Sequence, residues 1–186
     1  MTKIYFVRHA KPDFKILDDL TRPLTDEGLK DSESLCELFK NKDINKVYSS
    51  PYKRAIDTVL PVAQMLNLKI NIVEDFRERR ICNKWLDDFD SFAKNQWRDF
   101  NYKIEDGECL LEVQQRNINA LKSILRKNNN KNIIIGTHGT ALSTIINYYD
   151  VTFKYEHFER IKNIMPWVVM LEFEGENFVK FKYISN

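Results

Sequence analysis

Short apolar runs alternate with helical stripes of apolar residues along most of the chain. Thr2–Val7 is a nearly continuous β-branched and apolar run, with the length and composition of a buried strand. Three further runs of this kind predict additional strands at Lys46–Ser49, Lys69–Val73 and Asn132–Thr137. Each run is too short for a helix, so a sheet is expected to form the centre of the fold.

Helical stripes fill the intervals between these runs. Thr25 is a candidate N-cap, because apolar residues recur near helical spacing after it. Ser50-Pro51 predicts a second helix start, with a capping hydroxyl followed by proline at the first helical position. Pro61 lies inside that second helix and should kink it. Three more stripes predict helices at Phe89–Phe100, Glu108–Lys127 and Gly139–Tyr149.

The carboxyl-terminal part of the chain has a different pattern. Trp167–Phe173 and Asn177–Ile184 flank a Glu-Gly-Glu turn, and alternating apolar positions in the second run predict a β-hairpin. Before the hairpin, strands alternate with helices, which predicts an α/β fold with three α/β/α layers around a mainly parallel central sheet. The 186 residues suit a single domain, which we expect over residues 1–186.

Composition excludes several classes of protein. Five glycines, five prolines and 43% hydrophobic residues argue against disorder. The net charge of +2 and the lack of a basic stripe with interleaved aromatic residues argue against nucleic-acid or membrane partners. The three cysteines form no CxxC pair, so neither a zinc site nor a disulfide framework is indicated. The amino-terminal apolar run is too short for a signal peptide, and we expect a cytoplasmic protein.

Polar residues follow each predicted parallel strand. Arg8 and His9 come after the first strand, and Arg54 lies one helical turn beyond the second. Glu78 stands in the Arg-Glu-Arg sequence after the third strand, and His138 follows the fourth directly before Gly139. Because open α/β sheets bind ligands beyond the carboxyl ends of their strands, these side chains should converge on one edge.

This set of residues suits a phosphoryl group. Arginine presents forked donors that match phosphate oxygens, and the helix starts at Ser50-Pro51 and His138-Gly139 would add backbone N–H donors. A histidine in such a pocket can act as a nucleophile, and nearby cations would keep His9 neutral. Glu78 is the placed acid that could protonate a leaving oxygen.

Five spaced motifs resemble the histidine phosphatase superfamily, the phosphoglycerate mutase-like group. They are VRHA at residues 7–10, SSPYKRAIDT at 49–58, FRER at 76–79, DGEC at 106–109 and GTHGT at 136–140. Their order is that of the family, and the similarity extends from Thr2 to Ile146.

The resemblance implies a mechanism. His9 would attack phosphorus and form a phosphohistidine, while Arg8, Arg54, His138 and the adjoining Gly139 bind the phosphoryl oxygens. Glu78 would protonate the leaving alkoxide and then activate the hydrolytic water. No metal and no other cofactor is implied.

The chain departs from the family pattern in three places. Ala10–Lys15 replaces a stretch that often holds glycine, an acid and Thr or Ser, followed by asparagine, and this argues against a mutase. Cys109 replaces a frequent serine, which should affect packing only. Residues 79–106 correspond to the segment that covers the site in relatives, so we expect a lid that selects the substrate; it carries the aromatic residues Trp85, Trp97, Phe100 and Tyr102.

The favoured hypothesis is therefore a metal-independent phosphatase acting on a small phosphorylated metabolite. The alternatives are phosphoglycerate mutase-type phosphoryl transfer and a non-catalytic phosphate-binding module. Lys11 and Arg79 could contact a second anionic group of the substrate, but solvated charge is the simpler interpretation, and His157 is interpreted as structural. The sequence carries no signal for an oligomeric state.

Overall fold

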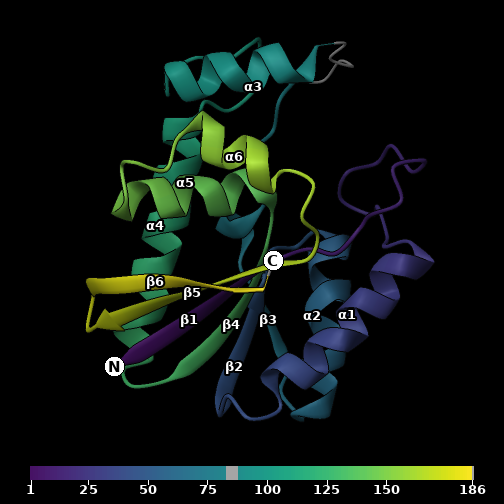
Figure 1. The fold of residues 1–186 in the computed structure, drawn as a ribbon, viewed down its shortest axis with the longest axis vertical. Coiled ribbons are helices and arrows are strands. Elements are labelled where there is room, and N and C mark those ends of the chain that lie inside the picture. Colours follow the sequence, from purple (N-terminus) through teal and green to yellow (C-terminus); the bar gives the residue numbers. More distant parts are fainter. Residues whose placement is uncertain (83–87, 186) are drawn as a thin grey trace.

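The computed structural model describes residues 1–82 and 88–185 (Figure 1). Trp85 therefore lies outside the described residues. Within them, one sheet holds its strands in the order β3-β2-β4-β1-β5-β6. The strands are β1 (Thr2–Arg8), β2 (Ile44–Ser49), β3 (Ile70–Ile72), β4 (Asn132–Thr137), β5 (Trp167–Glu174) and β6 (Asn177–Ser185). The strands from β3 to β1 run parallel, while β5 and β6 form the predicted antiparallel hairpin at one edge.

Helices cover both faces of this sheet, as Figure 1 shows. They are α1 (Asp26–Phe39), α2 (Lys53–Met65), α3 (Phe89–Arg98), α4 (Leu110–Lys127), α5 (Gly139–Tyr149) and α6 (Tyr155–Ile161), with a 3-10 turn at Glu74–Phe76. The α/β fold class and the mainly parallel sheet are confirmed.

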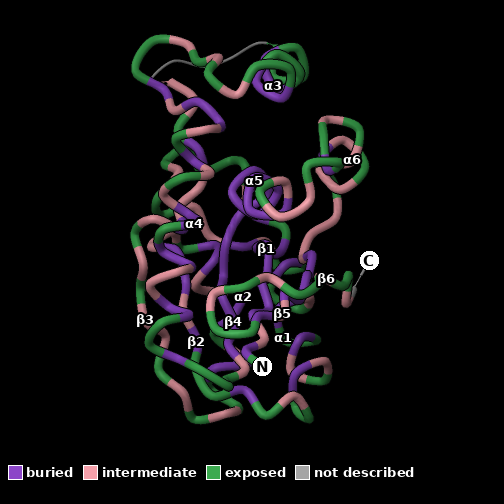
Figure 2. Tube along the Cα trace, turned by 90° about the vertical axis from the view of Figure 1, so that its left-hand side faces the viewer, coloured by how far each residue is buried: buried purple, intermediate pink, exposed green. Residues whose placement is uncertain are grey.

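Two hydrophobic clusters explain the layers. In β1, Tyr5 and Val7 belong to the cluster formed with α1 and α2. Ile4 and Phe6, which point to the other face, belong to the cluster formed with α4 and α5. Side chains of a strand alternate between faces, so a fully apolar strand is buried only between two helical layers. The tube in Figure 2 shows β1 and α5 as mostly buried segments at the centre of the molecule.

Local capping explains where α1 begins but not where α2 begins. Thr25 caps α1 as expected, and its hydroxyl accepts a hydrogen bond from the Gly28 N–H at 3.1 Å. The prediction that α2 begins at Ser50-Pro51 is wrong, because α2 begins at Lys53 with Tyr52 as its N-cap residue. The Ser50 hydroxyl instead forms a hydrogen bond with the ring of His138, and it accepts a hydrogen bond from the Tyr52 N–H. The short helix α6 has no counterpart in the predicted elements.

The helix α3 carries the aromatic stripe of the expected lid. Its buried face includes Phe92 and Trp97. The Trp97 ring lies 5.9 Å from the ring of Phe153 and 5.8 Å from that of Phe158, measured between centroids. Phe158 belongs to α6, next to which α3 lies in Figure 1. The stripe therefore joins α3 to the main hydrophobic cluster.

Candidate active site

Strand register brings the predicted residues to one sheet edge. β1 and β4 end side by side, with Arg8 opposite Thr137, and β2 ends beside them, with Ser49 opposite Gly136. The residues that follow β1 and β4 are His9 and His138, whose ring centroids lie 5.3 Å apart. The convergence expected at the carboxyl ends of the parallel strands is thus observed.

His9 is held in one tautomer. Its ring is buried, with 6% of the residue exposed, and Nδ1 lies 2.8 Å from the carbonyl oxygen of Ala10. A carbonyl only accepts, so Nδ1 carries the proton and Nε2 keeps its lone pair. Burial lowers the pKa of His9 well below 6.5, and the charges of Arg54 and Arg8 lower it further. His9 is therefore a neutral imidazole with an unprotonated, nucleophilic Nε2.

Arg8 is a buried cation with part of its fork already engaged. Nη1 donates to the carbonyls of Ile161 and Ile164 at 2.7 and 3.1 Å, and Nη2 donates to the backbone carbonyl of Lys162 at 2.8 Å. The second hydrogen of Nη2 and the Nε–H, which has no partner within the described residues, remain for a ligand oxygen. Burial lowers the pKa of Arg8 to about 10, so the side chain stays charged near neutral pH.

Gly139 packs directly against this guanidinium. A Cβ at that position would lie 3.1 Å from the Arg8 Cζ and Nε atoms. Because the carbonyls at the end of α6 hold Arg8, the guanidinium could not move away without losing hydrogen bonds. Gly139 therefore permits the close approach of helix α5 to the cation, which is its role in the site.

Arg54 projects from the first turn of α2 and is 3% exposed. Nη1 donates to the Asp19 carbonyl at 2.6 Å and lies 3.1 Å from the Asp19 Oδ1. The same carboxylate accepts from Arg22 at 2.8 Å. Burial lowers the pKa of Arg54, although Asp19 and Glu78 oppose this shift. The loop before α1 thus places one carboxylate and a further arginine beside the predicted phosphate ligand.

His138 is fully buried and forms the N-cap position of α5. Its Nε2 lies 2.7 Å from the Ser50 Oγ, and its Nδ1 has no partner within the described residues. Burial lowers its pKa well below 6.5, with Arg54 lowering it further. The Tyr52 ring lies against it, with centroids 5.0 Å apart. His138 is therefore a second neutral imidazole, and its Nδ1 is buried without a partner among the described residues.

Glu78 lies on the N-terminus of α5. Its carboxylate accepts from the backbone N–H groups of Thr140 at 3.0 Å and Ala141 at 3.1 Å, and from that of Arg79 at 2.8 Å. The expectation that this helix end donates its N–H groups to phosphate is therefore wrong in part, because the carboxylate occupies two of them. A helix N-terminus favours a negative charge, which explains the placement.

Several residues of the site were missed by sequence reasoning. Asp19 and Arg22 have no motif that marks them, Tyr52 lies within the SSPYKRAIDT motif but was given no role, and Ser50 was interpreted as a helix cap. Arg22 directly precedes Pro-Leu-Thr at the start of α1. This position indicates a site residue only once the loop is known to fold back on α2, as the hydrogen bond from the Lys53 N–H to the Leu20 carbonyl shows. These contacts are long-range and leave no local pattern.

The other two charged candidates, Lys11 and Arg79, differ in their exposure to solvent. Lys11 is half-exposed and pairs with Glu27, as expected of solvated charge. For Arg79 that interpretation is wrong, because the residue is 5% exposed and donates to Gln96 of α3. Its guanidinium also lies 5.1 Å from the ring centroid of Phe92. His157 stacks on the Phe153 ring, which fits a structural role.

Across residues 1–82 and 88–185, no group of three or more His, Cys, Asp or Glu side chains could hold a metal ion. In the same part of the chain, no helix has the length and hydropathy needed to cross a membrane.

The model of the histidine phosphatase superfamily (branch 1) matches residues 4–184. Phosphoserine phosphatase 1 of Hydrogenobacter thermophilus is 25% identical over 156 residues, which cover 74% of this chain and 71% of that protein. A metal-independent phosphoserine phosphatase of Arabidopsis thaliana is 28% identical over 162 residues, or 78% of this chain and 67% of that protein.

Solved structures agree on the fold. Phosphoserine phosphatase from Entamoeba histolytica in complex with 3-phosphoglyceric acid superimposes with a TM-score of 0.80 at 18% identity, covering 100% of this chain and 98% of that chain. The family match spans nearly the whole sequence and includes every site residue described above. The chain belongs to the histidine phosphatase superfamily (branch 1), and it is a phosphatase, a phosphoric monoester hydrolase.

Proposed function

We propose that this phosphatase hydrolyses a small phosphate monoester without a metal, through a phosphohistidine on His9. The observation that carries the proposal is the state of His9, a buried neutral imidazole whose Nδ1–H is engaged by the Ala10 carbonyl and whose Nε2 is unprotonated. Arg8 and Arg54 lie close enough to lower its pKa, so the nucleophile stands among the cations that an incoming phosphoryl group needs.

In the first step, His9 Nε2 forms a bond to phosphorus as the bond from phosphorus to the ester oxygen breaks. Arg8, Arg54 and the Nδ1 edge of His138 stabilise the charge on the non-bridging oxygens. Glu78, protonated beside the bound phosphate, gives its proton to the departing alkoxide. It can serve this site because Thr140 and Ala141 hold its carboxylate at the start of the same helix that His138 caps.

In the second step, the Glu78 carboxylate takes a proton from water, and that water attacks phosphorus. The bond from His9 to phosphorus breaks, inorganic phosphate leaves and His9 returns to its neutral form. One carboxyl group therefore acts first as an acid and then as a base, as microscopic reversibility of the two half-reactions requires.

The substrate class is supported by the relatives and by the shortness of residues 79–106. Two relatives are named phosphoserine phosphatases, and one structural neighbour is in complex with 3-phosphoglyceric acid. We propose one domain over residues 1–186, in which residues 79–106 form a short lid that admits a small phosphorylated metabolite. We further propose that the enzyme works in the cytoplasm, without nucleic-acid or membrane partners.

The test is a panel of esters assayed with and without excess chelator. It contains phosphoserine, 3-phosphoglycerate, glycerol phosphate and p-nitrophenyl phosphate, and it measures both inorganic phosphate and isomerised products. We expect net phosphate release that the chelator does not change and that His9→Ala abolishes. Isomerisation without phosphate release would indicate a mutase instead. Phosphate binding without turnover would indicate a binding module, and activity restored only by a divalent ion would indicate a metal-dependent enzyme.

A further inference from the structure

Arg116 of α4 lies behind the loop that carries Glu78, and all of its donors are used. Nη1 donates to the carbonyls of Asp75 and Arg77 at 2.6 and 2.9 Å, and Nη2 donates to the carbonyl of Glu78 at 3.2 Å. The other two N–H groups reach Glu108, from Nε to Oε1 at 2.8 Å and from Nη2 to Oε2 at 3.0 Å. A guanidinium has five N–H donors, so this fork is saturated.

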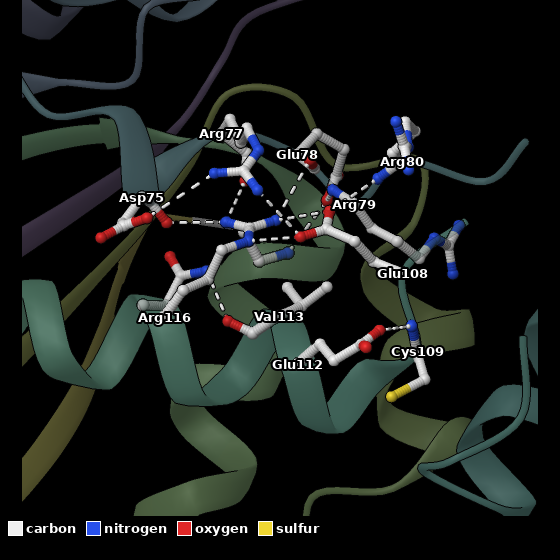
Figure 3. Close-up of polar contacts among 12 residues, drawn as sticks. Asp75, Arg77, Glu78, Arg79, Arg80, Glu108, Cys109, Glu112, Val113 and Arg116 are labelled. Atoms are coloured by element: carbon white, nitrogen blue, oxygen red, sulfur yellow. Dashed lines mark hydrogen bonds and ion pairs between the residues drawn. The ribbon is translucent and has the colours of Figure 1, made fainter. Parts of the chain in front are cut away.

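The Glu108 carboxylate lies next to the Arg116 guanidinium, as Figure 3 shows. Besides Arg116, it accepts from Arg77 Nη2 at 3.0 Å and from the Arg80 backbone N–H at 3.0 Å. Burial alone would raise the pKa of Glu108, but hydrogen bonds from Arg116 and Arg80 outweigh burial and lower it. The carboxylate thus stays charged, and Arg116 with Glu108 holds the loop on both sides of Glu78.

The loop needs such support because it has little of its own. Residues 77–80 follow the 3-10 turn and belong to no helix or strand. The carbonyls of Arg77 and Glu78 that Arg116 binds therefore have no partners within a regular element, and a buried unpaired carbonyl is costly. Arg116 and Glu108 are themselves 11% and 14% exposed at their side chains, so water is largely excluded from the cluster.

We propose that Arg116 is a positioning residue, which fixes the backbone of the Glu78 loop so that the carboxylate stays on the N-terminus of α5 and faces the phosphoryl site. The proposal rests on the acid–base role proposed for Glu78. Arg116 itself does not touch the reacting atoms, and it acts through the three carbonyls and through Glu108. Lysine cannot replace it, because one ammonium group offers three donors from a single point.

The choice of leaving group separates positioning from general support of the fold. An alkyl phosphate needs its leaving oxygen protonated, whereas p-nitrophenolate leaves readily without an acid. A misplaced Glu78 should therefore slow phosphoserine far more than p-nitrophenyl phosphate, measured as kcat/KM, which reports the first chemical step. If the wild type does not hydrolyse phosphoserine, the fastest alkyl ester of the panel takes its place.

The experiment compares Arg116→Lys, Glu78→Gln and the double variant. We expect Arg116→Lys to lower kcat/KM for the alkyl ester by about 10- to 100-fold, the size of effect that a small misplacement of a catalytic group produces. For p-nitrophenyl phosphate we expect a loss of less than about 3-fold by the same reasoning. The double variant should be no slower than Glu78→Gln, since both changes remove one function.

Controls make the outcomes distinct. Arg126→Lys changes an exposed arginine of the same helix, paired with Glu176, and should behave as the wild type. If Arg116→Lys does not fold, Glu108→Gln weakens the same clamp from the acceptor side. Equal losses for both esters, or additive losses in the double variant, would overturn the positioning role. If Glu78→Gln itself shows no dependence on the leaving group, the proposed role of Glu78 fails instead.

Discussion

Asp19 is the residue whose placement most directly affects an incoming anion. Its carboxylate is half-exposed at 48% and lies between Arg22 and Arg54, whose side chains are 16% and 4% exposed. The Asp19 carboxylate therefore offsets part of the positive charge that binds the phosphoryl group in the proposed mechanism. A phosphate that binds Arg54 must compete with this carboxylate.

Asp19→Asn should strengthen the binding of inorganic phosphate. The change removes a negative charge but keeps the shape of the side chain, and the Asp19 carbonyl still accepts from Arg54. We expect the inhibition constant for phosphate to fall about two- to five-fold, which corresponds to the modest strength of a half-exposed ion pair. Competitive inhibition measured against p-nitrophenyl phosphate provides the value.

Glu37→Gln is the matched control. It removes one carboxylate of an exposed pair with Lys40 near the end of α1 and should leave the inhibition constant unchanged. Weaker phosphate binding in Asp19→Asn, or an equal change in the control, would show that Asp19 does not compete with phosphate.

At the level of elements, regular structure was predictable and the contacts between its ends were not. The predicted bounds of β4 and α5 match the structure to the residue, because the buried strand is followed two residues later by a glycine that opens a helix. By contrast, α6 has seven residues with Phe158 alone buried, too weak a stripe to predict. The carbonyl of Ile161, its last residue, accepts a hydrogen bond from Arg8, which lies 153 residues earlier in the chain.

The candidate site shows the same division. Arg8, His9, Arg54 and His138 could be placed because each follows a strand or opens a helix, and parallel strand ends converge. Of the charge run 77–80, only Glu78 could be assigned a role from sequence. Arg79 is buried because α3 packs over it, and the path of the Glu78 loop depends on Arg116 of α4, which is 38 residues away. Both facts depend on tertiary packing.

At the level of the whole molecule, an almost neutral chain holds a strongly cationic interior site. The net charge is only +2. Nevertheless Arg8 and Arg54 are both buried beside His9 and His138, and burial together with these cations lowers the pKa of both imidazoles. The folded protein therefore resists protonation at two histidines that the unfolded chain would protonate freely.

This difference predicts how stability depends on pH. The unfolded histidines titrate near 6.5, whereas the folded ones titrate well below that value. Below 6.5 the unfolded state binds more protons, so the free energy of unfolding falls as pH falls and is greatest above 6.5. Each histidine contributes a slope of about 1.4 kcal/mol per pH unit once its unfolded form is protonated. Urea unfolding between about pH 5.5 and 7.5, above the range of ordinary carboxylates, measures it.

A variant assigns this slope to the site. His138→Gln should remove about half of the slope, because one of the two buried imidazoles is gone. His157→Gln, which changes a histidine outside the site, is measured beside it as the matched control. A wild-type slope in His138→Gln would contradict the assignment.

The central claim is that phosphate passes through His9. The direct measurement is to quench the enzyme in base during turnover of p-nitrophenyl phosphate and to map the phosphorylated residue by mass spectrometry. The account predicts an acid-labile phosphate on His9, more of it in Glu78→Gln, where the hydrolytic water lacks its base, and none in His9→Ala. Phosphate on a different residue, or near-normal turnover by His9→Ala, would contradict it.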